Sequence, residues 1–308
     1  MMDFQHNLED GYSYILAKKE GLLIGILGYI PTFLYDSALK KELQYSTVSW
    51  FVDLEARIPG LGMLLFRNLL TEKKASFCYA LSISKQAFVM HEVLGYKIGW
   101  MKHAYIVNHT IKEFKILQKN LLSKKLTGNG RNELQLLQLD NFDELTAEFE
   151  GSIEVVPTKS ATYFKNRFLM HPIYQYEVYG ILTEGKLEAL FATRSVQANN
   201  ANAIRLVDFV GNLKLLYNIA PELQNLLVIK KAEYIDIYYS GLNQKALELS
   251  GFISRSKESD TIVPNYFEPF EASNIELNFA YRFINKEDKR KVLLFKADGD
   301  QDRPNNIS

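Results

Sequence analysis

Hydrophobic and polar positions in the first half of the chain follow strand and helix patterns in turn. Two β-rich runs, Tyr12–Lys18 and Leu22–Pro31, lie on either side of the turn at residues 19–21 and predict a pair of strands. The amphipathic stretch Lys85–Leu94 predicts a helix that Gly95 ends. The other elements predicted for this half are strands at Tyr45–Val52, Phe77–Ser82 and Tyr96–Val107 and a helix from Met63 to about Lys74.

The second half repeats this order of elements after a polar segment. Residues 123–132 lose the apolar periodicity and collect turn-forming residues, so we predict a linker there, between a first domain at 1–122 and a second domain at 133–308. The helices predicted for the second domain are Phe142–Phe149, Ala161–Met170, Pro221–Lys231 and Gln244–Ser250. Its predicted strands are Leu134–Leu139, Tyr174–Leu182, Leu187–Ser195, Ala203–Val210 and Tyr234–Tyr239.

One short pattern occurs once in each half. Residues 92–96 and 248–252 both end a helix with glycine and continue with an aromatic residue, Tyr96 or Phe252. Any helix can end in this way, so the pattern supports a duplication only because the neighbouring elements also match in order.

A glycine-spaced turn joins the strand at Tyr45–Val52 to the helix that follows. Residues 57–62 read Arg-Ile-Pro-Gly-Leu-Gly, an R-x-x-G-x-G pattern. A strand that enters a helix through such a turn points unpaired N–H groups and the positive end of the helix dipole at one spot, which suits a phosphate or pyrophosphate. A Walker loop is excluded because Met63-Leu64 replaces its Lys-Ser/Thr end, and Leu65 stands where the dinucleotide fingerprint needs a third glycine. A tight connection without a ligand remains the alternative.

Composition narrows the classes of function. The 308 residues are 47% hydrophobic and 23% charged, which fits a soluble globular chain of two domains. Lys plus Arg and Asp plus Glu both number 36, so no overall field favours nucleic acid or an acidic membrane surface. No stretch has the roughly 18 apolar residues of a membrane span, and the first six residues lack a signal-peptide pattern, so we expect a cytoplasmic protein.

The cysteine and histidines argue against two further classes of site. Cys78 is the one cysteine, so no internal disulfide can form, and its apolar surroundings predict a buried thiol rather than a nucleophile. The five histidines form no H-E-x-x-H motif or other metal-ligand cluster, so we expect no metal.

With these features together, the first half resembles the GNAT superfamily of acyl-CoA-dependent N-acyltransferases. The R-x-x-G-x-G turn resembles the family's pyrophosphate motif, and residues 87–96 resemble the helix and turn after its fifth strand. The likeness covers about residues 12–107 by motif and 134–255 by element order. It implies an α/β (α+β) fold of two GNAT-like mixed-sheet domains in tandem. The second domain is degenerate, because Val210-Gly211-Asn212-Leu213-Lys214 replaces its pyrophosphate turn.

The resemblance implies that acyl-CoA is the co-substrate and that an amine attacks its thioester directly, in a site between the domains. Coenzyme A would lie between the fourth and fifth strands. The residues expected to bind it are Val52, Arg57, Ile58, Gly60, Leu61, Gly62 and Met63. His91 occupies the position where the family often has a general-acid tyrosine, and a packing role is the alternative. Asp53 and Glu55 are the candidate bases, with exposed strand-end carboxylates as the alternative.

The second domain and the C-terminal tail supply the candidate acceptor site. Candidate substrate-binding residues are Asp208, Tyr238, Asn243 and Asp300, and Asp298 is a further catalytic candidate. The acidic tail around 295–305 resembles GNAT-like proteins of bacterial surface-polysaccharide pathways, which implies a nucleotide-linked amino sugar as acceptor. A peptide or other small amine, or a non-catalytic CoA-binding sensor, are the alternatives. We expect small-molecule substrates only, and a monomer or homodimer.

Overall fold

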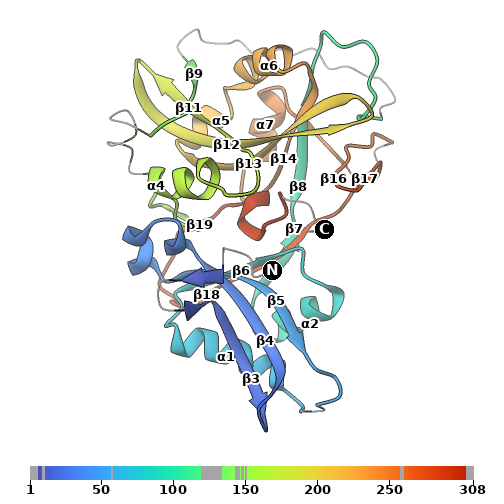
Figure 1. The fold of residues 1–308 in the computed structure, drawn as a ribbon. Coiled ribbons are helices and arrows are strands. Elements are labelled where there is room, and N and C mark those ends of the chain that lie inside the picture. The colour runs from blue at the N-terminus through green and yellow to red at the C-terminus, as the bar shows by residue number, and fades with distance from the viewer. Residues whose placement is uncertain are drawn as a thin grey trace.

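The computed structural model contains two large mixed sheets, one in the lower and one in the upper half of Figure 1. It describes residues 6–8, 11–56, 58–118, 134–142, 146, 149, 151–256 and 260–302. The predicted linker at 123–132 and most of the predicted helix at Phe142–Phe149 lie outside these residues, so the domain boundary stays a prediction. No described helix is long and apolar enough to span a membrane.

The first sheet contains the strands predicted for the first half. Its order is β3-β4-β5-β6-β18-β7. The strands are β3 (Tyr14–Lys19), β4 (Leu22–Pro31), β5 (Gln44–Val52), β6 (Phe77–Leu81), β18 (Asn278–Phe283) and β7 (Lys97–Trp100). Helices α1 (Leu61–Glu72) and α2 (Lys85–Val93) follow β5 and β6, as predicted, and the 3-10 turns η2 (Thr32–Leu34) and η3 (Ser37–Glu42) connect β4 to β5.

The second sheet has the order β15-β8-β14-β13-β12-β11-β9, and β20 pairs with β14 beside this row. Its strands are β9 (Leu134–Gln138), β11 (Glu177–Thr183), β12 (Lys186–Ala198), β13 (Ala201–Gly211), β14 (Ala232–Ser240), β8 (Lys102–Val107), β15 (Ile253–Ser254) and β20 (Leu294–Phe295). The helical segments of this half are α4 (Ala161–Phe164), the π-helical turn η4 (Lys165–Leu169), α5 (Leu213–Leu216), α6 (Ala220–Ile229) and α7 (Gln244–Leu249).

Three short two-stranded ladders and one turn complete the described structure. The ladders are β1 (Asn7–Leu8) with β2 (Gly11–Tyr12), β10 (Val155–Val156) with β19 (Lys291–Val292), and β16 (Tyr266–Phe267) with β17 (Phe270–Glu271). The C-terminal 3-10 turn is η5 (Lys296–Gly299).

The two halves exchange one strand each. Residues 96–107 were predicted as one strand, but they form β7 in the first sheet and β8 in the second, where β8 lies between β14 and β15. In return, β18 comes from the C-terminal part of the chain and lies between β6 and β7. Both inserted strands are antiparallel to their neighbours. The sheets therefore do not separate cleanly at residues 123–132.

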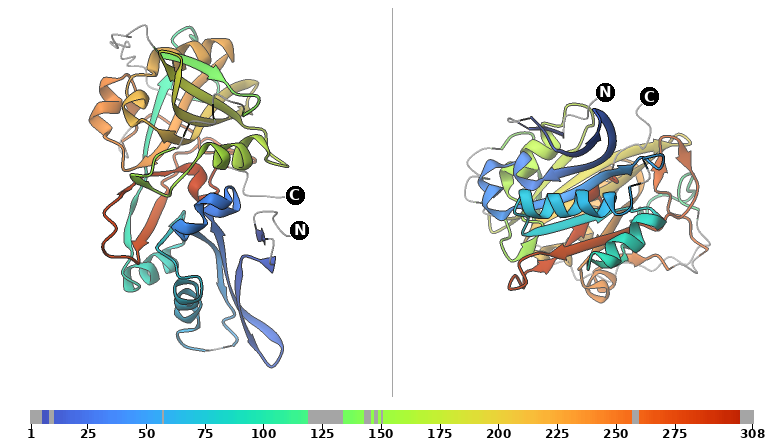
Figure 2. Two further views of the ribbon diagram at one scale, coloured as in Figure 1. Left: turned by 90° about the vertical axis from the view of Figure 1, so that its left-hand side faces the viewer. Right: turned by 90° about the horizontal axis from the view of Figure 1, so that it is seen from below.

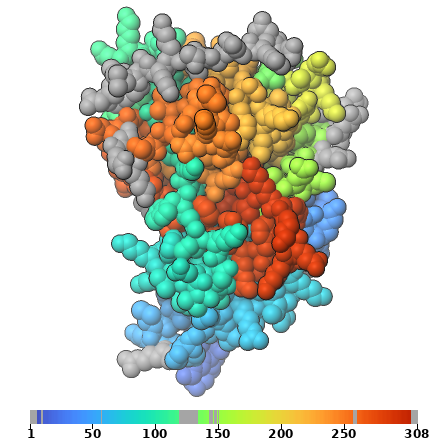
Figure 3. All heavy atoms as spheres, turned by 180° about the vertical axis from the view of Figure 1, so that it is seen from behind, coloured from blue at the N-terminus to red at the C-terminus, as the bar shows by residue number. Residues whose placement is uncertain are grey.

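The helices α1 and α2 cover one face of the first sheet, and the other half of the molecule covers part of the opposite face. On the helix side, Leu65, Phe66 and Leu69 of α1 pack against Leu27 and the strands below. On the other side, Ile30 and the partly buried Val48 pack against the cluster that includes α4. Figure 2 shows η5 between the two halves, and Figure 3 shows the C-terminal segment at the surface between them from behind.

Candidate active site

The strands β5 and β6 diverge, and the gap between them is the first element of the candidate site. They are paired in parallel only from Gln44 with Phe77 to Ser46 with Tyr79. Beyond this point Thr47 still contacts β6, because its hydroxyl group donates to the Tyr79 carbonyl oxygen at 3.3 Å. From Val48 onward, the β6-facing edge of β5 has no β6 partner in the pairing register.

A β-bulge lies on β5 at the same level. Val48 pairs with Gly28 and Phe51 pairs with Ile26, so Ser49 and Trp50 together oppose a single residue of β4. Ser49 has a φ of 47°, in the left-handed region that a non-glycine residue seldom occupies. Because a bulge interrupts the ladder, it leaves main-chain groups of β5 free for another partner. Sequence gave no signal for this bulge, since serine at position 49 fits an ordinary strand.

A cavity of about 220 Å³ fills the gap between the diverging strands. All of the residues that line it come from the first half of the chain. They are Leu27, Thr47, Val48, Ser49, Trp50, Phe66, Ala80, Leu81, Ser82, Ile83, Ser84, Ala87 and His91. The cavity is thus bounded by the bulge, by the end of β6 and by both helices.

The glycine turn leads from β5 into α1 as the R-x-x-G-x-G pattern predicts. Gly60 is the N-cap residue with a φ of 76°, and no side-chain hydrogen bond caps this end. Leu61 N–H donates to the Ile58 carbonyl oxygen at 3.3 Å, and Leu64 N–H donates to that of Gly60 at 3.0 Å. Arg57 lies outside the described residues, so its predicted role stays a prediction. The N-terminal turn of α1 remains suited to an anion.

The second glycine of the pattern has a packing role. A Cβ built on Gly62 would lie 2.9 Å from Cζ2 and 3.2 Å from Nε1 of Trp50. The indole ring therefore lies directly against the first turn of α1, and only glycine leaves room for it. Nothing lies within 4 Å of a Cβ built on Gly60, which is needed for its positive φ alone.

His91 lines the cavity, but its geometry does not fit the predicted general acid. The side chain is 2% exposed and touches the rings of Trp50, Phe66 and Tyr96. Its Nδ1 lies 2.7 Å from the Ala87 carbonyl oxygen, so Nδ1 must carry the proton and Nε2 of the neutral ring carries none. Burial lowers the pKa of His91, which favours this neutral form. Nε2 is therefore an acceptor.

The two candidate bases do not line the cavity. Asp53 follows β5, and its Oδ1 accepts the Glu55 N–H at 2.9 Å in a local turn. Glu55 is exposed. The alternative stated for both, carboxylates at a strand end, describes the half-buried Asp53 and the exposed Glu55 better, because a base must reach the reacting amine.

Asp208 and Asp298 were predicted to contact substrate, but they form a buried ion pair with Lys159. Lys159 Nζ lies 2.5 Å from Asp208 Oδ1 and 2.8 Å from Asp298 Oδ1, and all three side chains are at most 3% exposed. Asp208 also accepts the Phe209 N–H, and Asp298 accepts the Phe295 N–H at 2.7 Å. Lys159, which sequence analysis did not single out, thus fixes η5 onto β13.

The other three predicted substrate residues also have structural partners. Tyr238 is 1% exposed, stacks on His103 at 3.9 Å and donates its hydroxyl proton to the Ile275 carbonyl oxygen. Asn243 caps α7, where its Oδ1 accepts the Ala246 N–H. Asp300 pairs with Arg167 at 2.8 Å. Tyr238 does not fit the predicted substrate set, because a buried side chain bonded within the core presents no binding surface, whereas Asn243 and Asp300 keep exposed atoms and stay predictions.

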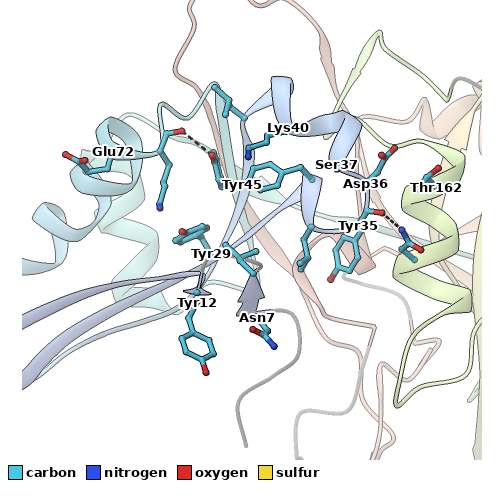
Figure 4. A pocket seen from close by; sticks show the side chains of 17 residues that line it. Asn7, Tyr12, Tyr29, Tyr35, Asp36, Ser37, Lys40, Tyr45, Glu72 and Thr162 are labelled. Carbon is cyan, nitrogen blue, oxygen red and sulfur yellow. Dashed lines mark hydrogen bonds between the residues drawn. The ribbon is translucent and has the colours of Figure 1, made fainter.

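A larger cavity of about 670 Å³ lies at the other end of α1 (Figure 4). Glu72 and Lys73 at the end of the helix form one wall, and Thr162 of α4 forms the opposite wall. Tyr29 and Tyr45 point into it, and Tyr45 donates its hydroxyl proton to the Lys73 carbonyl oxygen. Because α1 runs antiparallel to β5, this cavity and the glycine turn lie at opposite ends of the helix.

No metal centre is indicated in the described part of the chain. There, no group of three or more His, Cys, Asp or Glu side chains is placed to hold a metal ion. Cys78 is buried, as predicted, and burial raises the pKa of its thiol to about 12, so it is not a thiolate at neutral pH.

Solved structures of other proteins resemble this chain. No protein-family model and no curated protein matches it. A GCN5-related N-acetyltransferase from Anabaena variabilis superposes with a TM-score of 0.51 and 11% identity over 89% of this chain and 63% of that protein. A probable N-acyltransferase from Enterococcus faecalis gives a TM-score of 0.51 and 8% identity over 88% of this chain and 62% of that protein.

The chain therefore spans less than two thirds of the length of these two structures. At such low identity the likeness concerns the fold. The fold is a mixed α/β one with two GNAT-like domains in tandem.

Proposed function

We propose that the chain is an acyl-CoA-dependent N-acyltransferase that binds its co-substrate between β5 and β6. The observation that carries this proposal is the cavity at the divergence of these strands, bounded by the bulge and located beside the N-terminus of α1. The GNAT-like fold supports it, because both structures compared above are described as acetyl- or acyltransferases. The N-terminus of α1 and the bulge on β5 would each bind a different part of the co-substrate.

The α1 end would bind the diphosphate of coenzyme A. The main-chain N–H groups of Ile58, Gly60, Gly62 and Met63 lie around the N-terminus of this helix, where the helix dipole favours an anion, whereas that of the predicted Leu61 already donates to the Ile58 carbonyl oxygen. Pro59 has no N–H to contribute. Arg57 and Val52 flank the turn and would add contacts, as the resemblance implies.

The bulge would hold the thioester. A main-chain N–H freed at Ser49 or Trp50 would donate to the thioester oxygen and stabilise the negative charge that develops there during attack. The amine nitrogen forms the new C–N bond, the C–S bond breaks, and coenzyme A leaves as the thiol once the amine proton is transferred. Holding the two reactants in line supplies much of the acceleration, so no nucleophilic residue is required.

A charge test at the glycine turn separates this proposal from a turn without a ligand. Gly60→Asp and Gly60→Asn have the same shape, both tolerate a positive φ, and the site offers room for either. We expect titration calorimetry to show at least tenfold weaker coenzyme A binding for Gly60→Asp and a much smaller loss for Gly60→Asn, because only the carboxylate repels the diphosphate. No binding by the wild type, or equal binding by both variants, would contradict the proposal.

For the acceptor, we propose the amino group of a nucleotide-linked amino sugar. The support is the sequence resemblance of the tail alone, because Asp298 and Asp300 are engaged in ion pairs. Release of the coenzyme A thiol should be measured with acetyl-CoA and a panel of nucleotide-linked amino sugars, peptides and small amines. Turnover only with peptide amines would replace the sugar, and binding without turnover of any amine would favour a sensor.

A further inference from the structure

The cavity of about 670 Å³ at the C-terminal end of α1 has no part in the proposed coenzyme A site. Segments that are distant in the sequence meet there (Figure 4), namely the β1–β2 ladder, the η2–η3 connection, the end of α1, and α4 with η4. Its volume lies within the range of about 300–1,000 Å³ that is usual for small-molecule sites. The cavity is therefore large enough to be a second binding site.

Aromatic rings form the floor of this cavity and part of its rim. Tyr29 and Tyr45 are each 2% exposed and pack edge to face, with their ring centres 5.7 Å apart. Phe33 packs on Tyr45 in the same way at 6.1 Å. Phe33 is only half-buried and Tyr12 is 55% exposed, so both keep accessible ring surface. Such rings suit a flat ring of a ligand.

Two lysines that line the cavity have no ion-pair partner among the described residues. Lys40 comes from η3, and Lys73 is the C-cap residue of α1. The ion pairs of the described residues involve other cations. Lys73 Nζ lies 5.7 Å from the centre of the Tyr29 ring, and Figure 4 shows Lys40 beside Tyr45. Both ammonium groups therefore lie next to the aromatic floor, where an anion of the ligand would neutralise them.

The two acidic residues of the lining do not offer a site for a cation. Asp36 uses both carboxylate oxygens within the protein. Its Oδ1 accepts the Ala38 N–H at 3.0 Å, and its Oδ2 accepts the hydroxyl proton of Ser160. Glu72 is exposed and lies at the far edge of the cavity in Figure 4. Neither carboxylate thus faces the aromatic floor as a free acceptor.

The C-terminal end of α1, the negative pole of the helix, is also occupied by the protein. The Leu69 carbonyl oxygen accepts the Lys73 N–H, and that of Leu70 accepts the Ala75 N–H. Tyr45 donates its hydroxyl proton to the Lys73 carbonyl oxygen at 3.1 Å. Because these acceptors have partners, the helix end does not favour a cationic ligand over an anionic one.

We propose that this cavity binds a nucleotide, with its base against the aromatic rings and its phosphate on Lys40 and Lys73. Exposed side chains with hydrogen-bonding groups line the space that remains for the sugar hydroxyl groups, and they are Asn7, Ser37 and Thr162. A sugar phosphate would leave the aromatic rings uncovered, and a nucleoside would leave both ammonium groups unpaired. A nucleotide satisfies all three parts of the lining.

The test is titration calorimetry of the full chain with the common nucleoside monophosphates. Ribose 5-phosphate, which lacks the base, and the nucleosides, which lack the phosphate, are the partial ligands. Lys40→Gln and Lys73→Gln each remove one ammonium group. Lys41→Gln and Lys74→Gln are the matched controls, because these exposed neighbours do not line the cavity. Each titration is repeated with saturating coenzyme A, which itself contains a nucleotide.

We expect the wild type to bind at least one nucleoside monophosphate, and Lys40→Gln and Lys73→Gln to bind it about three- to tenfold more weakly. Both control variants should bind it as the wild type does. The matching nucleoside should bind more weakly and equally to all variants, and ribose 5-phosphate should bind at least tenfold more weakly than the monophosphate. Unfolding temperatures should not change, because neither lysine has an ion-pair partner to lose.

Two sources share this ligand chemistry, a free nucleotide and the nucleotide part of the proposed acceptor. The release of the coenzyme A thiol distinguishes them. If the nucleotide competes with a nucleotide-linked amino sugar in this assay, the cavity binds the acceptor. If the nucleotide binds without such competition, its ligand is a free nucleotide.

Three outcomes would overturn the inference. They are no binding of any nucleoside monophosphate, equal losses in the control variants, which would indicate a diffuse basic surface, and displacement of the nucleotide by coenzyme A, which would place it at the other end of α1. Coenzyme A binding that is unchanged in Lys40→Gln and Lys73→Gln would accompany any of these if the proposed function alone is right. Nucleotide binding without any coenzyme A binding would overturn the proposed function and leave this inference in place.

Discussion

The buried triad of Lys159, Asp208 and Asp298 makes a specific prediction about stability and pH. One lysine cannot neutralise two carboxylates, and all three side chains are shielded from water. Burial raises the pKa of Asp208, the nearby Asp298 raises it as well, and the attraction of Lys159 opposes both, so that the pKa lies at about 7. Burial alone would lower the pKa of Lys159, but the two carboxylates raise it, so the lysine stays charged. Asp208→Asn keeps the shape of this side chain and removes its charge, so this variant tests the contribution of the carboxylate.

The sign follows from proton linkage. The pKa of Asp208 is higher in the folded state than its ordinary value of 3.8, so folding favours the protonated acid. Its stabilising contribution is present in acid and is lost as the pH rises toward 7. Relative to the variant, the wild type should lose about 1.4 kcal/mol per pH unit over most of this window, or about 3 kcal/mol between pH 5 and pH 8. Asp208→Asn should therefore gain about 3 kcal/mol of stability relative to the wild type between pH 5 and pH 8.

The assay is urea unfolding of both proteins at intervals from pH 5 to pH 8. Burial lowers the pKa of His91 and lowers that of His103 to about 4, so both histidines give the opposite slope below pH 6.5. This slope is common to wild type and variant and cancels in their difference. Asp260→Asn, at an exposed position, is the control and should follow the wild type. A difference between wild type and Asp208→Asn that does not change with pH would refute the reasoning.

Three further predictions concern the same regions. Lys159→Met should lower the free energy of unfolding by about 3–5 kcal/mol at pH 8 in urea, since it leaves two buried carboxylates without their cation; a loss under 1 kcal/mol would contradict the ion pair. Gly62→Ala should displace the Trp50 ring and lower both thermal stability and coenzyme A affinity, whereas Gly60→Ala should cost only about 1 kcal/mol of backbone strain; equal effects would contradict the packing. Calorimetry should give one coenzyme A per chain, and two would show that the second sheet also binds it.

The fold was predictable from the sequence wherever a local pattern determined it. The strands and helices from β3 to α2 follow apolar periodicity and glycine stops, and the structure confirms them. The exchange of β8 and β18 was not predictable. Residues 96–107 have the pattern of one strand, and their sequence does not indicate that its two parts join different sheets. Which strands pair depends on the surfaces that they bury together in the folded protein. The alternation of apolar and polar residues within one strand does not identify its partner.

In the candidate site, too, features that depend on local sequence were predicted, and features that depend on distant contacts were not. The glycine turn was found because its spacing imposes a backbone geometry, which is a local property. Trp50 was missed because an aromatic residue in a strand normally packs in the core, and nothing local in the sequence shows that it also lines a cavity. The prediction that the acidic tail binds substrate missed partners that are distant in the sequence. Its aspartates look solvated in sequence, but Asp298 is buried in an ion pair with Lys159 and Asp300 pairs with Arg167, each more than a hundred residues away.

The second sheet differs from the first at the place that corresponds to the proposed coenzyme A site. Its parallel strands β13 and β14 pair from Asn202 with Ala232 to Leu206 with Ile237 and then separate, as β5 and β6 do. There, β20 pairs with Tyr239 and Ser240 of β14, and η5 contacts both strands. The chain's own backbone thus takes the place where a ligand would pair, and the Lys159 triad holds it there. A second coenzyme A would have to displace that segment and expose three buried charged groups, so we expect the second sheet to bind none.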